Sequence, residues 1–135
     1  MLCLITIAIA SFFVLSQNVK VTATELKVGE PIAYVLVPDK ISDLGLLGKN
    51  IFELKCQSCH GINAAGHHEM GPPLVHKIYE PSHYSDQSFY RAVALGVKSH
   101  HWRFGNMAAV EDLTKGDVKA IISYVRELQR ENGIF

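Results

Sequence analysis

Two cysteines followed directly by a histidine form the most chemically specific feature of this 135-residue chain. In the segment Cys56-Gln57-Ser58-Cys59-His60, two residues separate the thiols and the imidazole comes next. This is the pattern of covalent haem attachment. Each thiol adds across one vinyl group of the haem to form a thioether, and the histidine that follows ligates the iron. The motif therefore predicts one covalently bound haem c.

Two other kinds of site use cysteines at this spacing. A redox-active Cys-x-x-Cys pair belongs at a strand-to-helix junction, whereas this pair follows a predicted helix in a chain with few predicted strands. A structural zinc site takes four Cys or His ligands. The candidates to complete one are His67, His68 and His76, but their spacing matches no zinc-finger pattern. The motif favours haem over both alternatives.

The second axial ligand of the iron has several candidates. Apart from Met1, the chain has Met70, ten residues after His60, and Met107, 47 residues after it. Either methionine can instead be a core residue. The histidine pairs His67/His68 and His100/His101 are alternative ligands of haem iron, or of copper or zinc. A lone histidine is, however, more often a surface or capping residue.

The elements that position these residues are predicted to be helices. Hydrophobic periodicity and capping signals predict a first helix from about Asp43 to Cys56, a second from Ser85 to Val97, and a third that is capped by Thr114 and ends at Gly133. The predicted buried stripe of the first helix is Leu44, Leu47, Ile51, Phe52 and Leu54. That of the last helix is Val118, Ile121, Ile122, Val125 and Leu128. The long connections 60–84 and 98–113 are predicted loops, and such loops often cover a ligand.

The N-terminal segment reads as an export signal. Residues 2–15 are almost wholly apolar, too short for a membrane span and suited to a secretory signal, and Val21-Thr22-Ala23 resembles the end of a cleavage site. No Lys or Arg precedes the apolar run, which leaves an uncleaved anchor open. The predicted organisation is a signal peptide (1–23), an extended lead-in (24–43), which forms either one strand or an extended arm, and one helical domain (44–135).

Charge and composition exclude some classes of function. Thirteen basic residues balance thirteen acidic ones, so no basic excess indicates a nucleic-acid partner, and steering of a partner by net charge is expected to be weak. The apolar share of 48% is typical of a globular chain. A domain this small has a modest core, and a cofactor at its centre would help it to fold.

From about Gly48 to the C-terminus, the chain resembles a class I cytochrome c. Gly48 and Phe52 stand eight and four residues before Cys56, as in the first helix of that family. Ile121 and Tyr124 match its last helix, which crosses the first at that glycine. The resemblance implies an all-α fold, in which a small helical domain wraps around one covalently attached haem.

The resemblance also implies roles for individual residues. Gly71-Pro72-Pro73-Leu74 is similar to the family's G-P-x-L segment, so the carbonyl of Pro72 is expected to accept a hydrogen bond from His60 and orient it. The family carries its distal methionine in the loop before the last helix, which implies Met107 as the second iron ligand. Met107 lacks the proline that often follows it there. Trp102 and Arg103 either hydrogen-bond a haem propionate or pack the loop.

These features predict single-electron transfer and no enzymatic activity, since a six-coordinate haem leaves no site for a substrate. The expected partners are a redox protein donor and acceptor. The protein is then a periplasmic carrier or the haem subunit of a larger oxidoreductase complex, with residues 24–43 as a contact. Membrane contact is expected only through an uncleaved segment 2–15. The alternative is a haem enzyme or gas-binding sensor with a labile sixth ligand.

Overall fold

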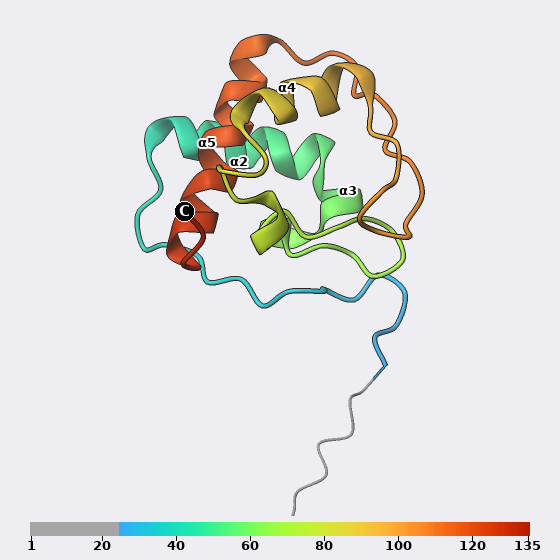
Figure 1. The fold of residues 1–135 in the computed structure, drawn as a ribbon. Coiled ribbons are helices and arrows are strands. Elements are labelled where there is room, and N and C mark those ends of the chain that lie inside the picture. The colour runs from blue at the N-terminus through green and yellow to red at the C-terminus, as the bar shows by residue number, and fades with distance from the viewer. Residues whose placement is uncertain (1–24) are drawn as a thin grey trace, which may run out of the picture.

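The computed structural model describes residues 25–135, so the predicted signal segment lies outside the described residues. The chain forms four α-helices and two short 3₁₀ turns within this range (Figure 1). They are α2 (Asp43–Lys55), α3 (Gln57–His60), η1 (Ile62–Ala64), η2 (Lys77–Tyr79), α4 (Asp86–Leu95) and α5 (Lys115–Glu131). Residues 25–135 form two isolated β-bridges and no strand, which confirms the all-α prediction. None of their helices is long and apolar enough to cross a membrane.

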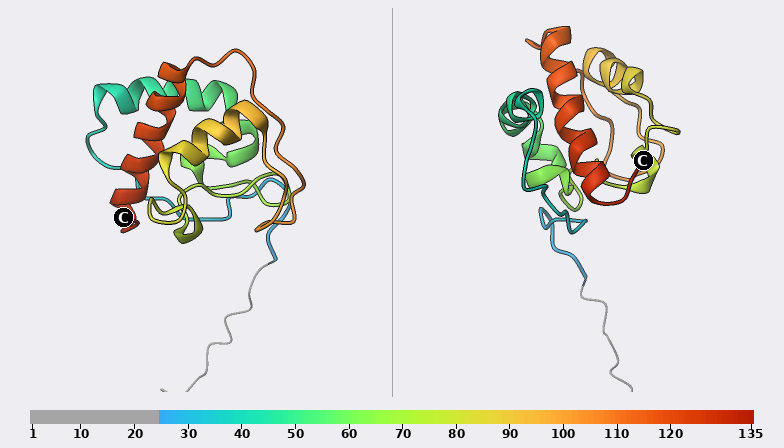
Figure 2. Two further views of the ribbon diagram at one scale, coloured as in Figure 1. Left: turned by 45° about the horizontal axis from the view of Figure 1, so that its top comes forward. Right: turned by 90° about the vertical axis from the view of Figure 1, so that its left-hand side faces the viewer.

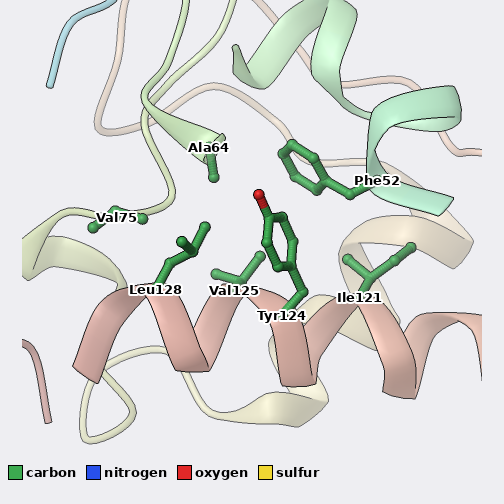
Figure 3. Packing of buried hydrophobic residues seen from close by; sticks show 7 residues of the cluster. All are labelled: Phe52, Ala64, Val75, Ile121, Tyr124, Val125 and Leu128. Carbon is green, nitrogen blue, oxygen red and sulfur yellow. The ribbon is translucent and has the colours of Figure 1, made fainter. Parts of the chain in front are cut away.

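The fold is organised by the crossing of α2 and α5 at Gly48. A Cβ added at Gly48 would lie 1.9 Å from the carbonyl oxygen of Ala120, so only glycine permits this approach of the two backbones. Beside the crossing, the rings of Phe52 and Tyr124 pack edge to face with their centroids 5.7 Å apart. Figure 3 shows this pair within the buried cluster. The cluster comprises Phe52, Ala64, Val75, Ile121, Tyr124, Val125 and Leu128.

The predicted buried stripe of the first helix is partly wrong. Leu44, Leu47 and Leu54 are 38%, 51% and 84% exposed. The buried face of α2 is made by Gly45, Gly48 and Phe52 instead. The physical reason is that α5 packs on the face with the small residues, where the backbones come closest, and not on the face with the most leucines.

The last helix agrees with its prediction. Thr114 caps α5 in a capping box with Asp117, which satisfies backbone donors at the start of the helix. All five residues of the predicted stripe are buried. The helix ends at Glu131, two residues before Gly133, which has a φ of +73°. α4 likewise ends at Leu95, before the predicted Val97.

Residues 25–42 form the extended arm that the sequence left as one of two alternatives, without a strand. The arm runs along the end of the domain away from the α2–α5 crossing (Figure 1). Its backbone bonds to the loop at residues 65–68, and the N–H and C=O of Leu36 both bond to the Asn132 side chain, each at about 2.9 Å or less. On the other side of the molecule, α4 packs against α5, which lies between α2 and α4 (Figure 2).

Candidate haem-binding site

The Cys-x-x-Cys-His motif forms a helical turn that continues directly from α2. The Cys56 N–H donates to the carbonyl of Phe52 at 2.8 Å, and the His60 N–H donates to that of Cys56 at 2.9 Å. Cys56 is half-buried and Cys59 is exposed. Burial, and next the nearby Cys59 thiol, raise the pKa of the Cys56 thiol to about 11. The helix thus carries both thiols and the imidazole on one turn, as thioether attachment at adjacent edges of a haem requires.

His60 is held in one orientation and one tautomer. The residue is only 9% exposed, and its Nδ1 lies 2.9 Å from the carbonyl oxygen of Pro72, as expected from the G-P-x-L segment. Because a carbonyl only accepts, Nδ1 must carry the proton, which leaves the lone pair on Nε2. Burial lowers the pKa of His60, and the bond to Pro72 only partly opposes this. The imidazole is therefore neutral and able to ligate a metal through Nε2.

A cavity with apolar walls opens in front of His60. The space within it is about 950 Å³, a volume that includes its open mouth. Residues from the motif turn, α4, α5 and both long loops line it. They include Phe52, Cys56, His60, Pro72, Leu74, Tyr79, Tyr84, Phe89, Val93, Val97, Trp102, Met107 and Ile121. The predicted site residues Cys56, His60, Pro72 and Met107 thus meet around one cavity, and Cys59 lies on the same turn.

Met107 is fixed by its backbone although no proline follows it. Its N–H donates to the carbonyl of Val97 and its own carbonyl accepts from the Val97 N–H, both at 2.9 Å. Asn106 adds a bond, since its side-chain oxygen accepts from the Ser99 N–H at 2.9 Å. Met70, by contrast, is 47% exposed and does not line the cavity. Of the two candidate methionines, Met107 therefore lines the cavity and Met70 does not.

The indole of Trp102 is one of the polar groups that line the cavity. Its Nε1 is buried and has no hydrogen-bond partner. A buried donor without a partner costs about 1–3 kcal/mol, which a ligand with an acceptor at that point would recover. A haem is apolar except for its two carboxylates. The apolar walls, the oriented His60 and the unpaired Nε1–H of Trp102 therefore fit a haem.

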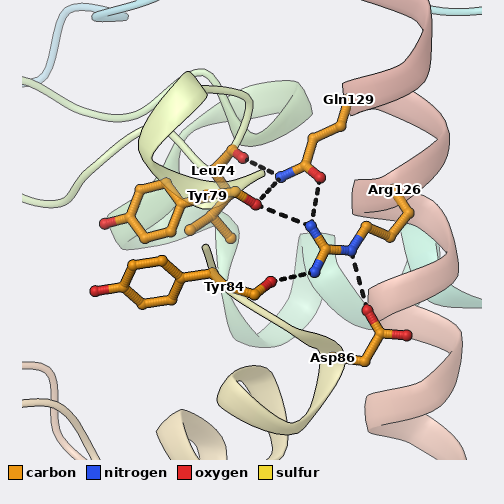
Figure 4. Close-up of polar contacts among 6 residues, drawn as sticks. All are labelled: Leu74, Tyr79, Tyr84, Asp86, Arg126 and Gln129. Atoms are coloured by element: carbon orange, nitrogen blue, oxygen red, sulfur yellow. Dashed lines mark hydrogen bonds and ion pairs between the residues drawn. The ribbon is translucent and has the colours of Figure 1, made fainter. Parts of the chain in front are cut away.

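A buried polar network that the sequence reading missed supports the cavity wall (Figure 4). The Arg126 guanidinium donates to the carbonyls of Tyr79 and Tyr84, to Asp86 at 3.0 Å and to Gln129 at 2.6 Å. Gln129 in turn donates to the carbonyls of Leu74 and Tyr79. Two residues of α5 thus fasten the whole segment 74–86, which bears cavity-lining side chains. The sequence did contain a signal for this network. Arg126 and Gln129 stand four and seven residues after Ile122, which places both polar side chains on the buried face of α5.

His100 and His101 line the cavity, and His83 lies beside His101. The hydroxyl of Tyr84 lies 2.5 Å from Nε2 of His100, whose Nδ1 bonds to the Lys98 carbonyl. The rings of His83 and His101 lie within 6.0 Å of each other and of the Tyr84 ring. In residues 25–135, no group of three or more His, Cys, Asp or Glu side chains is arranged to hold a metal ion. The zinc and copper alternatives thus gain no support from these residues.

The comparison with protein families agrees with this geometry. The family model described as Cytochrome c matches residues 46–129, which is more than half of the chain and includes every predicted site residue. The chain belongs to the cytochrome c family. No significant match was found among curated proteins or among solved structures. Membership confirms the predicted resemblance, the covalently attached haem c and haem-based electron transfer.

Proposed function

We propose that this protein carries single electrons outside the cytoplasm, with its haem attached through Cys56 and Cys59 and its iron ligated by His60 and Met107. When bound, the haem supplies an iron that accepts and releases one electron. The observation that carries the proposal is that His60 and Met107 line the same apolar cavity. A ligand on each side of the iron leaves no position for a substrate, so this arrangement suits a carrier and not an enzyme.

The chain's own residues set the conditions for that exchange. Burial keeps His60 neutral, the carbonyl of Pro72 orients its ring, and the proton on Nδ1 leaves the lone pair of Nε2 free to ligate the iron. The two bonds to Val97 hold Met107 in place, so the ligand needs little movement when the iron changes charge. The aromatic and aliphatic walls would limit the contact of a bound haem with water. Fixed ligands and limited contact with water keep reorganisation small, which favours rapid electron exchange.

The partners in this proposal are a redox protein that donates the electron and another that accepts it. Cytochrome c domains are typically exported, and the apolar start of the sequence supports a periplasmic location. The same site would serve a haem subunit of a larger oxidoreductase complex. Co-purification of the protein from its native membrane or periplasmic fraction distinguishes a free carrier from a subunit.

The test is the distal ligand. The ferric protein should show the weak near-infrared band of sulfur-to-iron charge transfer. Met107→Ala should abolish it, open the ferrous protein to carbon monoxide, and lower the reduction potential by a sizeable part of the roughly 0.8 V that axial ligands span. Met70→Ala is the matched control, because Met70 lies outside the cavity, and it should leave the band intact.

Other outcomes assign the site differently. Loss of the band in the Met70 variant would refute ligation by Met107. A wild type that lacks the band and binds carbon monoxide would favour the sensor or enzyme alternative. A low potential with neither property would indicate two histidine ligands, for which His100 and His101 are candidates because both line the cavity. Haem that leaves the chain on acid-acetone extraction would refute attachment through Cys56 and Cys59.

A further inference from the structure

The N-terminal arm is joined to the loop that follows the Cys-x-x-Cys-His motif. Residues 29–33 of the arm make four backbone hydrogen bonds to residues 65–68 of that loop, with lengths between 2.8 and 3.1 Å. The two segments lie side by side in Figure 1. The arm precedes residues 46–129, which the family model matches, so membership of the family gives the arm no role.

Within this loop, Gly66 packs against both the arm and a peptide group next to His60. A Cβ added at Gly66 would lie 2.9 Å from Cδ1 of Ile32 and 2.6 Å from the nitrogen of Pro73. Gly66 has a φ of +78°, and its N–H donates to the carbonyl of His60 at 2.7 Å. The side chain of Ile32 therefore packs against the residue that also contacts Pro73 and bonds to His60.

The nitrogen of Pro73 belongs to the same peptide group as the carbonyl of Pro72. A peptide group is planar and rigid, so its nitrogen and its oxygen cannot move independently. The Pro72 oxygen accepts the hydrogen bond from Nδ1 of His60 at 2.9 Å, and Pro73 is fully buried. A contact that fixes the nitrogen of this peptide group therefore also fixes the oxygen that orients His60.

Resting on the proposed function, in which His60 ligates the iron, we propose that Ile32 is a positioning residue for that ligand. Ile32 holds Gly66 against the Pro72–Pro73 peptide group, which keeps the Pro72 carbonyl bonded to His60. This bond makes the imidazole more basic and so stabilises ferric iron relative to ferrous iron. Ile32 does not line the haem cavity, so the arm lowers the reduction potential only through these contacts.

Ile32→Val tests the contact, because it deletes the Cδ1 atom that lies beside Gly66 and keeps the rest of the side chain. The first measurement is the rate at which the Nδ1 proton of His60 exchanges with deuterium, followed by proton NMR of the holoprotein. This proton exchanges when its bond to Pro72 opens. We expect exchange about two- to tenfold faster than in wild type, as the loss of one packed methyl group changes an opening equilibrium by this factor.

The second measurement is the reduction potential of the same holoprotein. It should rise in Ile32→Val, because a weaker bond to Pro72 leaves the imidazole less basic. Ile32→Leu restores a δ-carbon, so it should return both the exchange rate and the potential toward their wild-type values. Wild-type exchange and potential in Ile32→Val would overturn the proposal, as would a leucine variant that departs further from wild type than the valine variant does.

Val35→Ala separates positioning from general stability. Val35 lies in the same arm but packs against the buried cluster. Its truncation removes two carbon atoms, so it should lower the free energy of unfolding at least as much as Ile32→Val does. The exchange rate and the reduction potential should nevertheless stay at their wild-type values. If Val35→Ala changes both as much as Ile32→Val does, the arm acts through the stability of the domain, and the positioning role is refuted.

The near-infrared band separates failure of this inference from failure of the proposed function. None of these variants changes an axial ligand, so the band should persist in all of them. A wild type without the band would refute ligation by Met107. Exchange of the His60 ring proton would still report the role of Ile32, because this measurement needs only His60 as a ligand.

Discussion

His60 and Met107 reach the same cavity from supports of different kinds. His60 belongs to a turn continuous with α2, and α2 packs across α5 through the buried core. Met107 belongs to the loop 98–113 and is held by two backbone bonds to Val97. The residues around Met107, namely Gly105, Asn106 and Ala108, are exposed. The position of His60 is thus coupled to the stability of the whole domain, and that of Met107 to the stability of one loop.

This difference predicts how each side fails. A disturbance of the α2–α5 crossing must disturb the core, so it should unfold the protein and release both ligands together. A disturbance of the loop should release Met107 alone, because the core does not depend on it. Local opening of a loop costs less than global unfolding. With the proposed ligation, the Met107 side is therefore where the reduction potential and the access of small ligands should change without loss of the fold.

The largest effect is expected at the helix crossing. Gly48→Ala places a Cβ about 1.9 Å from the Ala120 carbonyl oxygen, which is backbone and cannot turn aside. The helices must separate, and we expect a loss of about 3 kcal/mol in the free energy of unfolding, the upper part of the usual range for overpacking. Chemical denaturation of the holoprotein measures it, and the near-infrared band should disappear in the same transition as the helical signal.

Gly116→Ala is the matched control, since it makes the same change on α5 where the nearest atom to the added Cβ is 3.5 Å away. It should raise the stability slightly, because alanine favours a helix more than glycine does. Equal stability of the Gly48 and Gly116 variants would contradict the crossing as the main support of the proximal side.

The sequence predicted the chemistry of this site better than the packing around it. The Cys-x-x-Cys-His motif and the G-P-x-L segment are local, and the resemblance to the cytochrome c family that rests on them placed His60 against Pro72. The cap of α5 at Thr114 is local too, and it was predicted correctly. The buried face of α2 was predicted only in part, since Phe52 is buried but Leu44, Leu47 and Leu54 are exposed. The prediction followed the leucines, whereas α5 packs where glycines let the two backbones approach.

Contacts between distant segments left weaker signals. The bonds of Arg126 to Tyr79 and Tyr84 join residues more than 40 positions apart, and no spacing rule connects them. The clamp between Val97 and Met107 is likewise a backbone contact, so side-chain identity does not report it. The missing proline after Met107 indicated a less rigid loop, but the structure shows these bonds in its place.

A smaller and more local effect is expected at Gly96. This residue has a φ of +72° and a ψ of −177°, a region open essentially to glycine alone, and an added Cβ would lie 2.4 Å from the Met107 carbonyl oxygen. Gly96→Ala should cost about 2 kcal/mol, within the usual range for such strain. The loop can relieve that strain by moving Met107. We expect a weakened near-infrared band and carbon monoxide binding in a protein that remains folded by circular dichroism.

Gly105→Ala separates the clash from the strain of positive φ. Gly105 has a φ of +88° in the same loop, and nothing lies within 4 Å of an added Cβ. This variant should keep the band while it loses some stability. If both variants lose the band equally, backbone strain anywhere in the loop releases Met107, and the Val97–Met107 clamp is not its specific support.

The smallest effect is expected at Glu127, far from both ligands, and it depends on pH. The Glu127 carboxylate accepts from the N–H and the hydroxyl of Ser42, at 2.8 and 2.6 Å, and from Ser123 at 3.0 Å, so it ties α5 to the start of α2. Burial alone would raise the pKa of Glu127, but the bonds from Ser42 and Ser123 and the nearby Arg130 outweigh it and hold that pKa below its ordinary value. A lowered pKa in the folded state means that the unfolded chain binds the proton more readily. The contribution of the Glu127 carboxylate to the free energy of unfolding is therefore full above the unfolded pKa of about 4.3. It disappears as the pH falls through the folded pKa.

Glu127→Gln should lower the free energy of unfolding by about 1 kcal/mol at pH 7, as expected for bonds to a charged acceptor in a partly exposed position. The difference in this free energy between the variant and wild type should close under acid conditions. Denaturation curves of both proteins at pH 7 and at pH 3 measure this gap, and the near-infrared band should stay unchanged at pH 7. A gap that is constant with pH would show that Glu127 acts through its shape and not its charge, and loss of the band at pH 7 would contradict the separation of helix scaffold from distal loop.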